Sequence, residues 1–275
     1  MRALLPFFSK SFPIFCMFEG HHNQEINDVC IFDDNSKFIT VGGDKLFFMW
    51  DVATGQIIRK FIGHNGKINS CKLNHTEGVI CTGSFDQTLK IWDLKAFSKY
   101  PIQTLNDCTD SVTSICCTDH EIICGSLDGC VRSYDIRKGR VLMVEFHHPV
   151  VSISLSSDND FLLASCLDNT IRLVNTSTGD LFSQYSGHTC QQYTISSCLD
   201  PSDSIVVSGS EDNRIYFWDL VNGNMMKQPQ PGEVLHSIHE HKGIVFCTKF
   251  HAESRKMLST SSDTTVKIWS CEQEK

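Results

Sequence analysis

The sequence predicts an all-β fold that is built from six copies of one four-stranded unit. The first observation is an Asp that is followed six residues later by an aromatic residue or, in one copy, by valine. The pairs are Asp44/Trp50, Asp86/Trp92, Asp128/Tyr134, Asp168/Val174, Asp212/Trp218 and Asp263/Trp269. Successive Asp residues are separated by 42, 42, 40, 44 and 51 positions. A period of about 40–45 residues is typical of β-propeller blades, so we expect one propeller domain with six recognisable blades.

The second observation is that the copies share one internal order. A Gly-His or His-rich element comes first, at Gly20-His21, Gly63-His64, His147-His148, Gly187-His188 and 239–241. In the second copy, short runs of β-forming residues follow at 68–73, 79–83 and 88–92, as in successive strands. A glycine then leads into a fourth strand at Gly55, Gly139, Gly179 and Gly223, whereas the second copy has Phe97 there. This order predicts three inner strands and one outer strand in each blade.

The two ends of the chain are expected to complete one blade together. We expect residues 1–14 to be an atypical N-terminal segment and residues 15–275 to form the propeller domain. The last copy, 244–269, supplies only three inner strands, and an open sheet edge favours aggregation. We therefore expect Phe15–Phe18 to be the outer strand of the last blade. The longest insertion, between Asp219 and His241, is polar and rich in proline, which predicts an exposed loop.

Composition excludes several classes of function. The chain has 24 Lys and Arg against 32 Asp and Glu, a net charge of −8, and an acidic chain is unsuited to bulk binding of nucleic acid. The apolar start, 1–18, is interrupted by Pro6, Lys10 and Pro13, so it predicts neither a signal peptide nor a membrane helix. The 14 cysteines include no Cys-x-x-Cys pair. We expect a reduced, intracellular protein.

The sequence contains no motif for a cofactor. It has no GxxxxGK[ST], GxGxxG or HExxH motif and no Cys₂His₂ spacing. The histidine clusters are His147-His148 and the group His236, His239 and His241, which we interpret as solvated or capping loop residues. We therefore expect no cofactor, no metal and no small-molecule substrate.

A His, a hydroxyl residue, an Asp and a Trp recur together in three copies. The sets are His64/Thr82/Asp86/Trp92, His188/Ser208/Asp212/Trp218 and His241/Ser259/Asp263/Trp269. A Ser-His-Asp hydrolase uses such a set once per active site, whereas here the set is repeated. We therefore predict a buried hydrogen-bond chain, in which Asp accepts from His, His meets the hydroxyl and the hydroxyl meets the indole N–H. The protein is predicted not to be an enzyme.

The third and fourth copies lack parts of this set. The third has Cys124 at the hydroxyl position, and the fourth has Ala164 there and Val174 in place of Trp. Basic residues follow the Asp by four positions at Lys90, Arg132, Arg172 and Lys267. We expect their stems to be buried and their heads to form ion pairs between blades; a ring of ligand-binding basic groups is the alternative.

Residues at the entry to the inner strands are candidates for a protein-binding surface, because loops on a rigid scaffold carry binding residues. The candidates are Glu25, Lys67, Ser111, Gln192 and Ile244. The alternative for each is an ordinary solvated loop residue.

Three stretches of the chain resemble a known family. They are 119–137, which ends in Tyr134-Asp135-Ile136-Arg137, together with 51–61 and 210–221. With the repeated Trp-Asp pattern, they resemble the WD-repeat family and, within it, scaffolds of mitogen-activated protein kinase signalling that also occur in spliceosomes. Such proteins look seven-bladed. We expect either a ring that closes with six blades or, as the favoured alternative, a chain that lacks the first repeat.

The resemblance implies a non-enzymatic scaffold whose partners are proteins. The implied partners belong to the extracellular-signal-regulated kinase cascade or to pre-mRNA splicing complexes, with cytoplasmic and nuclear localisation and no direct contact with nucleic acid or membrane. A different class stays open. Tyr134, Asp135, Ile136 and Arg137 resemble the Trp-Asp-x-Arg box with which substrate receptors of cullin-type ubiquitin ligases bind their adaptor, although Tyr replaces Trp.

Overall fold

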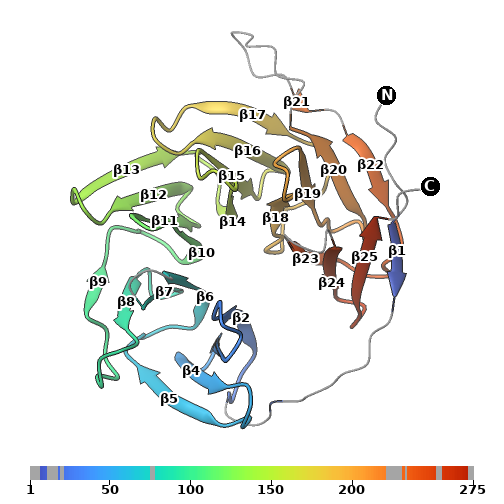
Figure 1. The fold of residues 1–275 in the computed structure, drawn as a ribbon. Coiled ribbons are helices and arrows are strands. Elements are labelled where there is room, and N and C mark those ends of the chain that lie inside the picture. The colour runs from blue at the N-terminus through green and yellow to red at the C-terminus, as the bar shows by residue number, and fades with distance from the viewer. Residues whose placement is uncertain are drawn as a thin grey trace. The chain divides into compact units, whose positions relative to one another are not determined.

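The computed structural model describes residues 7–10, 18, 22–74, 78–220, 231–232, 234–251 and 256–271. Within these residues the chain forms twenty-five strands and no helix, and the strands assemble into six sheets (Figure 1). Five of the sheets have four strands, and one has five. The predicted all-β fold with six four-stranded blades is therefore confirmed, with one strand added to the fourth blade.

The first three blades are formed by consecutive strands. Blade 1 contains β2 (Ile26–Ile31), β3 (Lys37–Gly42), β4 (Leu46–Asp51) and β5 (Ile57–Ile62). Blade 2 contains β6 (Ile68–Asn74), β7 (Val79–Ser84), β8 (Leu89–Asp93) and β9 (Gln103–Leu105). Blade 3 contains β10 (Val112–Cys117), β11 (Glu121–Ser126), β12 (Cys130–Asp135) and β13 (Arg140–Glu145). Their neighbouring strands are antiparallel, as short hairpin connections require.

The other three blades depart from this simple order. Blade 4 contains β14 (Val150–Leu155), β15 (Phe161–Cys166), β16 (Thr170–Asn175) and β17 (Leu181–Tyr185), and β21 (Pro231–Gly232) joins its edge parallel to β17. Blade 5 contains β18 (Ser197–Leu199), β19 (Ile205–Ser208), β20 (Ile215–Asp219) and β22 (Val234–Ile238). Blade 6 contains β23 (Val245–His251), β24 (Lys256–Ser261), β25 (Val266–Cys271) and β1 (Phe7–Lys10). Two parts of the insertion that we expected to be loop are therefore strands: β21 pairs with blade 4, and β22 is the outer strand of blade 5. Residues 221–230 lie outside the described residues.

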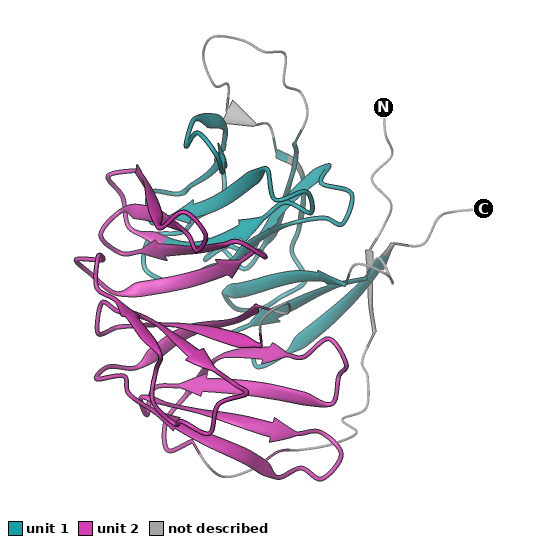
Figure 2. Cartoon of the chain, turned by 60° about the vertical axis from the view of Figure 1, so that its left-hand side comes forward, with its two compact units in different colours: residues 1–14, 151–275 teal, residues 15–150 magenta. Residues whose placement is uncertain are grey.

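The chain divides into two compact parts (Figure 2). Residues 15–150 hold blades 1–3, and residues 1–14 with 151–275 hold blades 4–6. In the first part, one apolar core between blades 1 and 2 includes Phe47 and Trp92, and another between blades 2 and 3 includes Ile115 and Ile122. The second part has equivalent cores between blades 4 and 5 and between blades 5 and 6. Packing of blade on blade explains why the inner strands are buried on both faces.

The recurring Asp forms the turn between the second and third strands of every blade. In blade 2, Asp86 Oδ1 accepts a hydrogen bond from Thr88 N at 3.1 Å, and Gln87 between them has a φ of 67°. In the other blades the residue after the Asp also has a positive φ, between 63° and 84°: Lys45, Gly129, Asn169, Asn213 and Thr264. Asp stabilises such turns by accepting from the backbone two residues further on. This local role explains why the Asp is present in all six copies.

The strand that completes blade 6 comes from residues 7–10. β1 pairs antiparallel with β25, with Phe7 opposite Cys271 and Lys10 opposite Ile268. The prediction that Phe15–Phe18 form this strand is therefore wrong in position. Residues 15–17 lie outside the described residues, and Phe18 packs edge-on against Phe38, with ring centroids 4.8 Å apart. Phe18 thus packs against Phe38 of blade 1. Residues 7–10, earlier in the chain, supply the outer strand of blade 6.

Candidate functional site

Blades 2 and 6 each contain the complete hydrogen-bond chain. In blade 2, His64 Nδ1 lies 2.9 Å from Asp86 Oδ2, and His64 Nε2 lies 2.7 Å from Thr82 Oγ1. The Trp92 indole N–H donates to Thr82 Oγ1 at 2.8 Å. The distances in blade 6 are 2.9 Å for His241 to Asp263, 2.7 Å for His241 to Ser259 and 2.8 Å for Trp269 to Ser259. The structure thus brings together both of these predicted sets.

The hydrogen-bond chain runs in one direction from donor to acceptor. Because an indole N–H only donates, the Thr82 oxygen accepts from Trp92, and the Thr82 O–H donates to His64 Nε2. His64 is then neutral, with its proton on Nδ1, and donates to Asp86. Burial lowers the pKa of His64 and so favours this neutral form. Burial alone would raise the pKa of Asp86, but the hydrogen bonds from His64 and Thr88 hold it well below its usual range.

Burial separates this chain from any substrate. Thr82 and Ser259 have an exposed fraction of 0%, and His64 and His241 are also buried. A catalytic hydroxyl must reach a reacting carbonyl, whereas the Thr82 oxygen is enclosed by the side chains that it bonds. Both hydrogen-bonding roles of the hydroxyl are already used. The arrangement therefore links β7, β8, the turn between them and the segment that precedes β6, and it is a structural element.

Blade 1 contains a third complete chain, which sequence analysis did not identify. His22 Nδ1 lies 2.9 Å from Asp44 Oδ1, His22 Nε2 lies 2.9 Å from Thr40 Oγ1, and the Trp50 N–H donates to Thr40 at 2.8 Å. The Gly-His pattern at Gly20-His21 indicated His21, whereas the histidine that forms the chain is His22. The spacing identifies the right one, because every fully bonded histidine precedes its Asp by 22 residues.

The predicted set in blade 5 does not form this chain. His188 is buried, but neither of its ring nitrogens has a hydrogen-bond partner among the described residues. Ser208 Oγ donates to the carbonyl of the next residue at 2.9 Å, and the Trp218 N–H donates to Ser186 O at 3.0 Å. His188, Ser208 and Trp218 therefore do not bond to one another, and the predicted hydrogen-bond chain is wrong for blade 5.

Two features of blade 5 explain the difference. His188 precedes Asp212 by 24 residues, two more than the interval in blades 1, 2 and 6. The Tyr216 hydroxyl donates to Asp212 Oδ2 at 2.6 Å and so satisfies the carboxylate that a histidine contacts elsewhere. Burial lowers the pKa of His188 to about 4, since a charged imidazolium there would lack a partner.

In blade 3 a pair of thiols takes the place of the histidine and the hydroxyl. Cys108 Sγ lies 3.9 Å from Cys124 Sγ, and both side chains are buried. Arg132 Nη1 lies 3.6 Å from Cys108 Sγ and donates to Asp128 Oδ2 at 2.9 Å. The hydrogen bond from Cys124 and the charge of Arg132 lower the pKa of Cys108. Blade 3 therefore keeps the turn-forming Asp but pairs it with a guanidinium.

The basic residues four positions after the Asp bond within their own blades. Arg132 and Arg172 pair with Asp128 and Asp168, four residues earlier. Lys90 donates to Thr104 Oγ1 in the outer strand of blade 2 at 3.2 Å. In blades 3 and 4 the turn brings the carboxylate next to the third strand, which explains these two ion pairs. Lys267 donates to the Glu240 carbonyl at 2.6 Å, in the segment before the first strand of blade 6.

The five candidate surface residues lie in different environments. Glu25, Lys67 and Gln192 are exposed, and Ile244 is half-buried. Ser111 is buried, with an exposed fraction of 2%, and accepts a hydrogen bond from Asn69 Nδ2 at 2.9 Å. Ser111 therefore joins blades 2 and 3 and does not belong to a binding surface.

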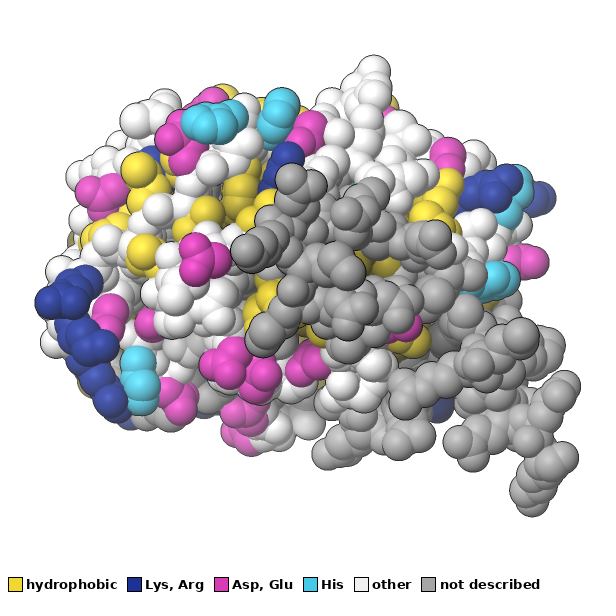
Figure 3. Space-filling view, turned by 90° about the horizontal axis from the view of Figure 1, so that it is seen from above, with side chains coloured by type: hydrophobic (Ala, Val, Ile, Leu, Met, Phe, Trp, Pro, Cys, Tyr) yellow, Lys and Arg dark blue, Asp and Glu magenta, His cyan; other side chains and the backbone are white. Residues whose placement is uncertain are grey.

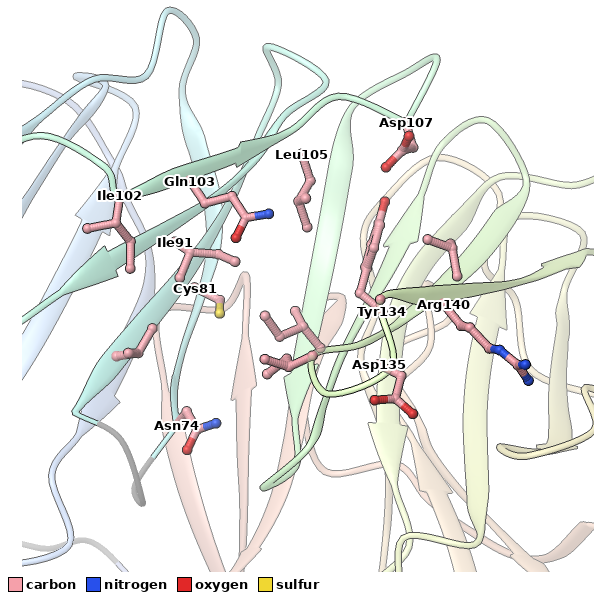
Figure 4. Close-up of a pocket in the computed structure, with 15 residues that line it drawn as sticks. Asn74, Cys81, Ile91, Ile102, Gln103, Leu105, Asp107, Tyr134, Asp135 and Arg140 are labelled. Carbon is pink, nitrogen blue, oxygen red and sulfur yellow. The ribbon is translucent and has the colours of Figure 1, made fainter.

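A cavity of about 350 Å³ lies between blades 2 and 3 (Figure 4). Blade 2 contributes Cys81, Ile91 and Leu105 to its lining, and blade 3 contributes Ile122, Tyr134 and Val141. Most of these side chains also belong to the apolar core between the two blades or pack against it. The volume lies at the lower end of the range of about 300–1,000 Å³ that is typical of ligand pockets.

The cavity accompanies a short outer strand in blade 2. β9 has three residues, whereas β5 and β13, the outer strands of blades 1 and 3, have six. β9 pairs with Leu89–Ile91 only, so the end of β8 lacks a neighbour in this ladder. The sequence contains a signal for this, because Phe97 replaces the glycine that leads into the fourth strand. Phe97 is fully exposed, at 100%.

The predicted adaptor box lies at this cavity. Tyr134, Asp135 and Ile136 line it, and Arg137 follows in the chain. Tyr134 is buried, with an exposed fraction of 7%, whereas Ile136 and Arg137 are exposed. Asp135 accepts from the backbone N–H groups of Arg137 and Lys138, both at 2.9 Å. Its carboxylate therefore stabilises the turn between β12 and β13.

One polar group inside the cavity lacks a hydrogen bond. The Tyr134 hydroxyl has no hydrogen-bond partner among the described residues, and it points toward Asp107 in Figure 4. Burial raises the pKa of Tyr134, and the Asp107 carboxylate nearby adds to the rise. Asp107 itself is exposed and forms no ion pair with a described residue. The cavity thus combines apolar walls with a hydroxyl and a carboxylate.

No group of three or more His, Cys, Asp or Glu side chains in the described residues is placed to hold a metal ion. The described residues also contain no helix that is long and apolar enough to cross a membrane. On the face in Figure 3, hydrophobic side chains are interspersed with charged ones over the described atoms. The cavity between blades 2 and 3 is therefore our candidate functional site.

The blades and their repeated His–hydroxyl–Asp–Trp chains define a WD-repeat β-propeller, a class of proteins that are typically non-catalytic interaction scaffolds. Comparison with known families agrees with this class. Residues 23–218 match the family described as "Nucleolar protein 10-like, N-terminal domain", a β-propeller, and residues 232–270 match the "WD domain, G-beta repeat". The first match spans more than half of the chain, so the chain belongs to the WD-repeat family of β-propeller proteins.

Several proteins with similar sequences are named WD repeat domain-containing protein 83 or a homolog of it. The chain is 30% identical over 277 residues to the WD repeat domain-containing protein 83 homolog of Dictyostelium discoideum, covering 90% of this chain and 82% of that protein. It is 41% identical over 142 residues to WD repeat domain-containing protein 83 of Rattus norvegicus, covering 51% and 45%. It is 36% identical over 174 residues to the Danio rerio protein of that name, covering 63% and 52%. The chain thus spans about half the length of these two vertebrate relatives.

Proposed function

We propose that this chain is a scaffold that holds components of the extracellular-signal-regulated kinase cascade together and takes part in pre-mRNA splicing complexes. The observation that supports a scaffold best is the cavity between blades 2 and 3, which offers apolar side chains to a partner on a rigid pair of sheets. In blades 2 and 6 the polar sets that could suggest catalysis are buried, and their side chains bond to each other. Binding, and not chemistry, is what the accessible groups support.

The choice of partners is supported by the sequence stretches 51–61, 119–137 and 210–221, which resemble scaffolds of this kind. Two of these stretches lie in blades 1 and 3, and the longest contains the Tyr134–Arg137 segment at the cavity. The proposal includes both cytoplasmic and nuclear localisation, because the two kinds of partner occupy these compartments.

The test is affinity purification of the tagged chain from matched cytoplasmic and nuclear extracts, with mass spectrometry of the bound proteins. We expect kinase-cascade proteins from the first extract and splicing factors from the second. Recovery of chaperones alone from both extracts would contradict the scaffold function. A chain with Trp92→Ala, which breaks the core of blade 2, serves as the control for unfolded protein.

A second candidate function is that of a substrate receptor of a cullin-type ubiquitin ligase. The observation that favours it is the exposed Arg137 at the end of β12, in the box that resembles an adaptor-binding motif. Arg137→Ala separates the two functions. Under the receptor function it abolishes adaptor binding, and under the scaffold function it leaves kinase and splicing partners bound.

A further inference from the structure

We propose that the cavity between blades 2 and 3 binds an extended segment of a partner protein in which one or two aliphatic or aromatic residues stand next to a lysine or arginine. This inference rests on the proposed scaffold function and specifies the chemistry of one of its docking sites. The occupant is a protein segment, and the cation enters next to Asp107.

The apolar side chains that line the cavity indicate that the bound segment carries aliphatic or aromatic residues. Cys81, Ile122 and Tyr134 form a buried base that the core of the two blades holds in place. Around it, Ile102, Ile136 and Val141 line the cavity while they expose 59%, 46% and 51% of their surface. Covering exposed aliphatic surface is favourable, because it removes apolar area from water. A peptide segment that places one side chain in the cavity also covers this rim with its neighbouring residues. A small compact ligand would fill the cavity and leave the rim exposed.

The negative charge of Asp107, at one end of the cavity, indicates that the bound segment carries a lysine or an arginine. Asp107 is exposed and without an ion pair among the described residues, so its charge is available to a ligand. Asp135 at the other end already accepts from two backbone N–H groups and lies 3.4 Å from Lys138 Nζ. The Arg140 guanidinium points away from the apolar lining in Figure 4. Asp107 is thus the available carboxylate of the lining, and a lysine or arginine complements it.

The Tyr134 hydroxyl gives a second polar contact. In blades 2 and 6 the aromatic residue at this position uses its N–H inside the blade, at 2.8 Å from a hydroxyl. Tyr134 is 93% buried, yet its hydroxyl has no such partner among the described residues and lies on the side of Asp107. A buried polar group without a hydrogen bond is unfavourable, because its lost contact with water is not replaced. A donor on the ligand, such as an ammonium shared with Asp107, removes this cost.

The first experiment is selection of short random peptides, displayed on phage, on the immobilised chain, with removal of those that also bind Ile102→Glu. We expect the enriched peptides to contain one or two large apolar residues next to Lys or Arg. Selected peptides that lack basic residues, or the absence of any peptide sensitive to Ile102→Glu, would overturn the proposal.

The second experiment measures the affinity of the best selected peptide by fluorescence anisotropy. Ile102→Glu and Asp107→Lys should each weaken binding by about tenfold or more. Met143→Glu and Asp119→Lys are the matched controls, because both residues are exposed in blade 3 but do not line the cavity; they should change binding less than about twofold. Changing the basic residue of the peptide to Glu should restore binding to Asp107→Lys. Equal affinity of the peptide for Asp107→Lys and the unchanged chain contradicts the assigned role of the carboxylate.

The same variants separate this inference from the scaffold function. If Ile102→Glu recovers the same partners from extracts as the unchanged chain, the scaffold function stands and the cavity is not its docking site. If the unchanged chain recovers no partner, the scaffold function itself fails.

Discussion

Cys108 and Cys124 lie sulfur to sulfur at 3.9 Å in blade 3, where blade 2 pairs a histidine with a threonine. Cys124 stands four residues before the turn-forming Asp128, as Thr82 stands four residues before Asp86. A thiol is a weaker hydrogen-bond donor and acceptor than a hydroxyl. Blade 3 is therefore held more by apolar packing and by the Arg132–Asp128 ion pair, and its aromatic residue is free to line a cavity.

We predict that the hydroxyl in blade 2 matters more to stability than the thiol in blade 3. Thr82→Val leaves the Trp92 N–H without its acceptor and His64 Nε2 without its donor, which should cost about 2–4 kcal/mol in the free energy of unfolding. Cys124→Ala removes one weak hydrogen bond and should cost about 1 kcal/mol. Urea unfolding measures both. Similar losses for the two variants would contradict the different roles of the two sites.

Two buried histidines should respond in opposite ways to the same substitution. His64→Leu leaves the buried Thr82 O–H without its acceptor and removes one of the donors to the Asp86 carboxylate, and it should destabilise by about 3 kcal/mol. His188→Leu removes two ring nitrogens that bond to no described residue and should be neutral or stabilising. Thermal unfolding of the two variants side by side tests this. A large loss for His188→Leu would show that His188 does have a partner.

The pH dependence of stability should carry the signature of His188. Its pKa is lowered to about 4 in the folded protein from 6.5, so the unfolded chain takes up the proton first as the pH falls. The stability that comes from neutral His188 is complete above pH 6.5 and is lost progressively between pH 6.5 and 4. By pH 5 the loss should be roughly 2 kcal/mol. His188→Leu should lose less stability than the unchanged chain between pH 7 and pH 5, and equal losses would refute this.

Removal of residues 1–10 should destabilise blade 6. The deletion removes β1 and leaves β25 with an unpaired edge, which both weakens the sheet and favours aggregation. We expect a loss of about 2 kcal/mol or more in the free energy of unfolding, and aggregation on heating. Replacing residues 1–6 alone with a Gly-Ser sequence is the control, since β1 is kept. Unchanged thermal unfolding of the deletion would show that this strand does not support the fold.

Local patterns in the sequence were enough to predict the blades. The Asp that precedes each aromatic position by six residues forms a turn with the residue after it and the backbone two residues on, so its spacing marks the turn directly. The chains in blades 2 and 6 also followed from spacing, because both blades share one strand register and each histidine precedes its Asp by 22 residues. His22 was within reach of the same reasoning through the 22-residue interval.

The sequence by itself therefore determined the repeat, the strand order within each blade and the recurring turn, since these depend on residues that are near each other in the chain. The tertiary structure decided the features that depend on competition between distant groups. Tyr216, and not His188, bonds to Asp212; residues 7–10, and not 15–18, pair with β25; and β9 is too short to fill the space between blades 2 and 3. In each case several side chains or segments could fill the same position, and their three-dimensional arrangement decides which one does. The spacing of residues along the chain does not describe that arrangement.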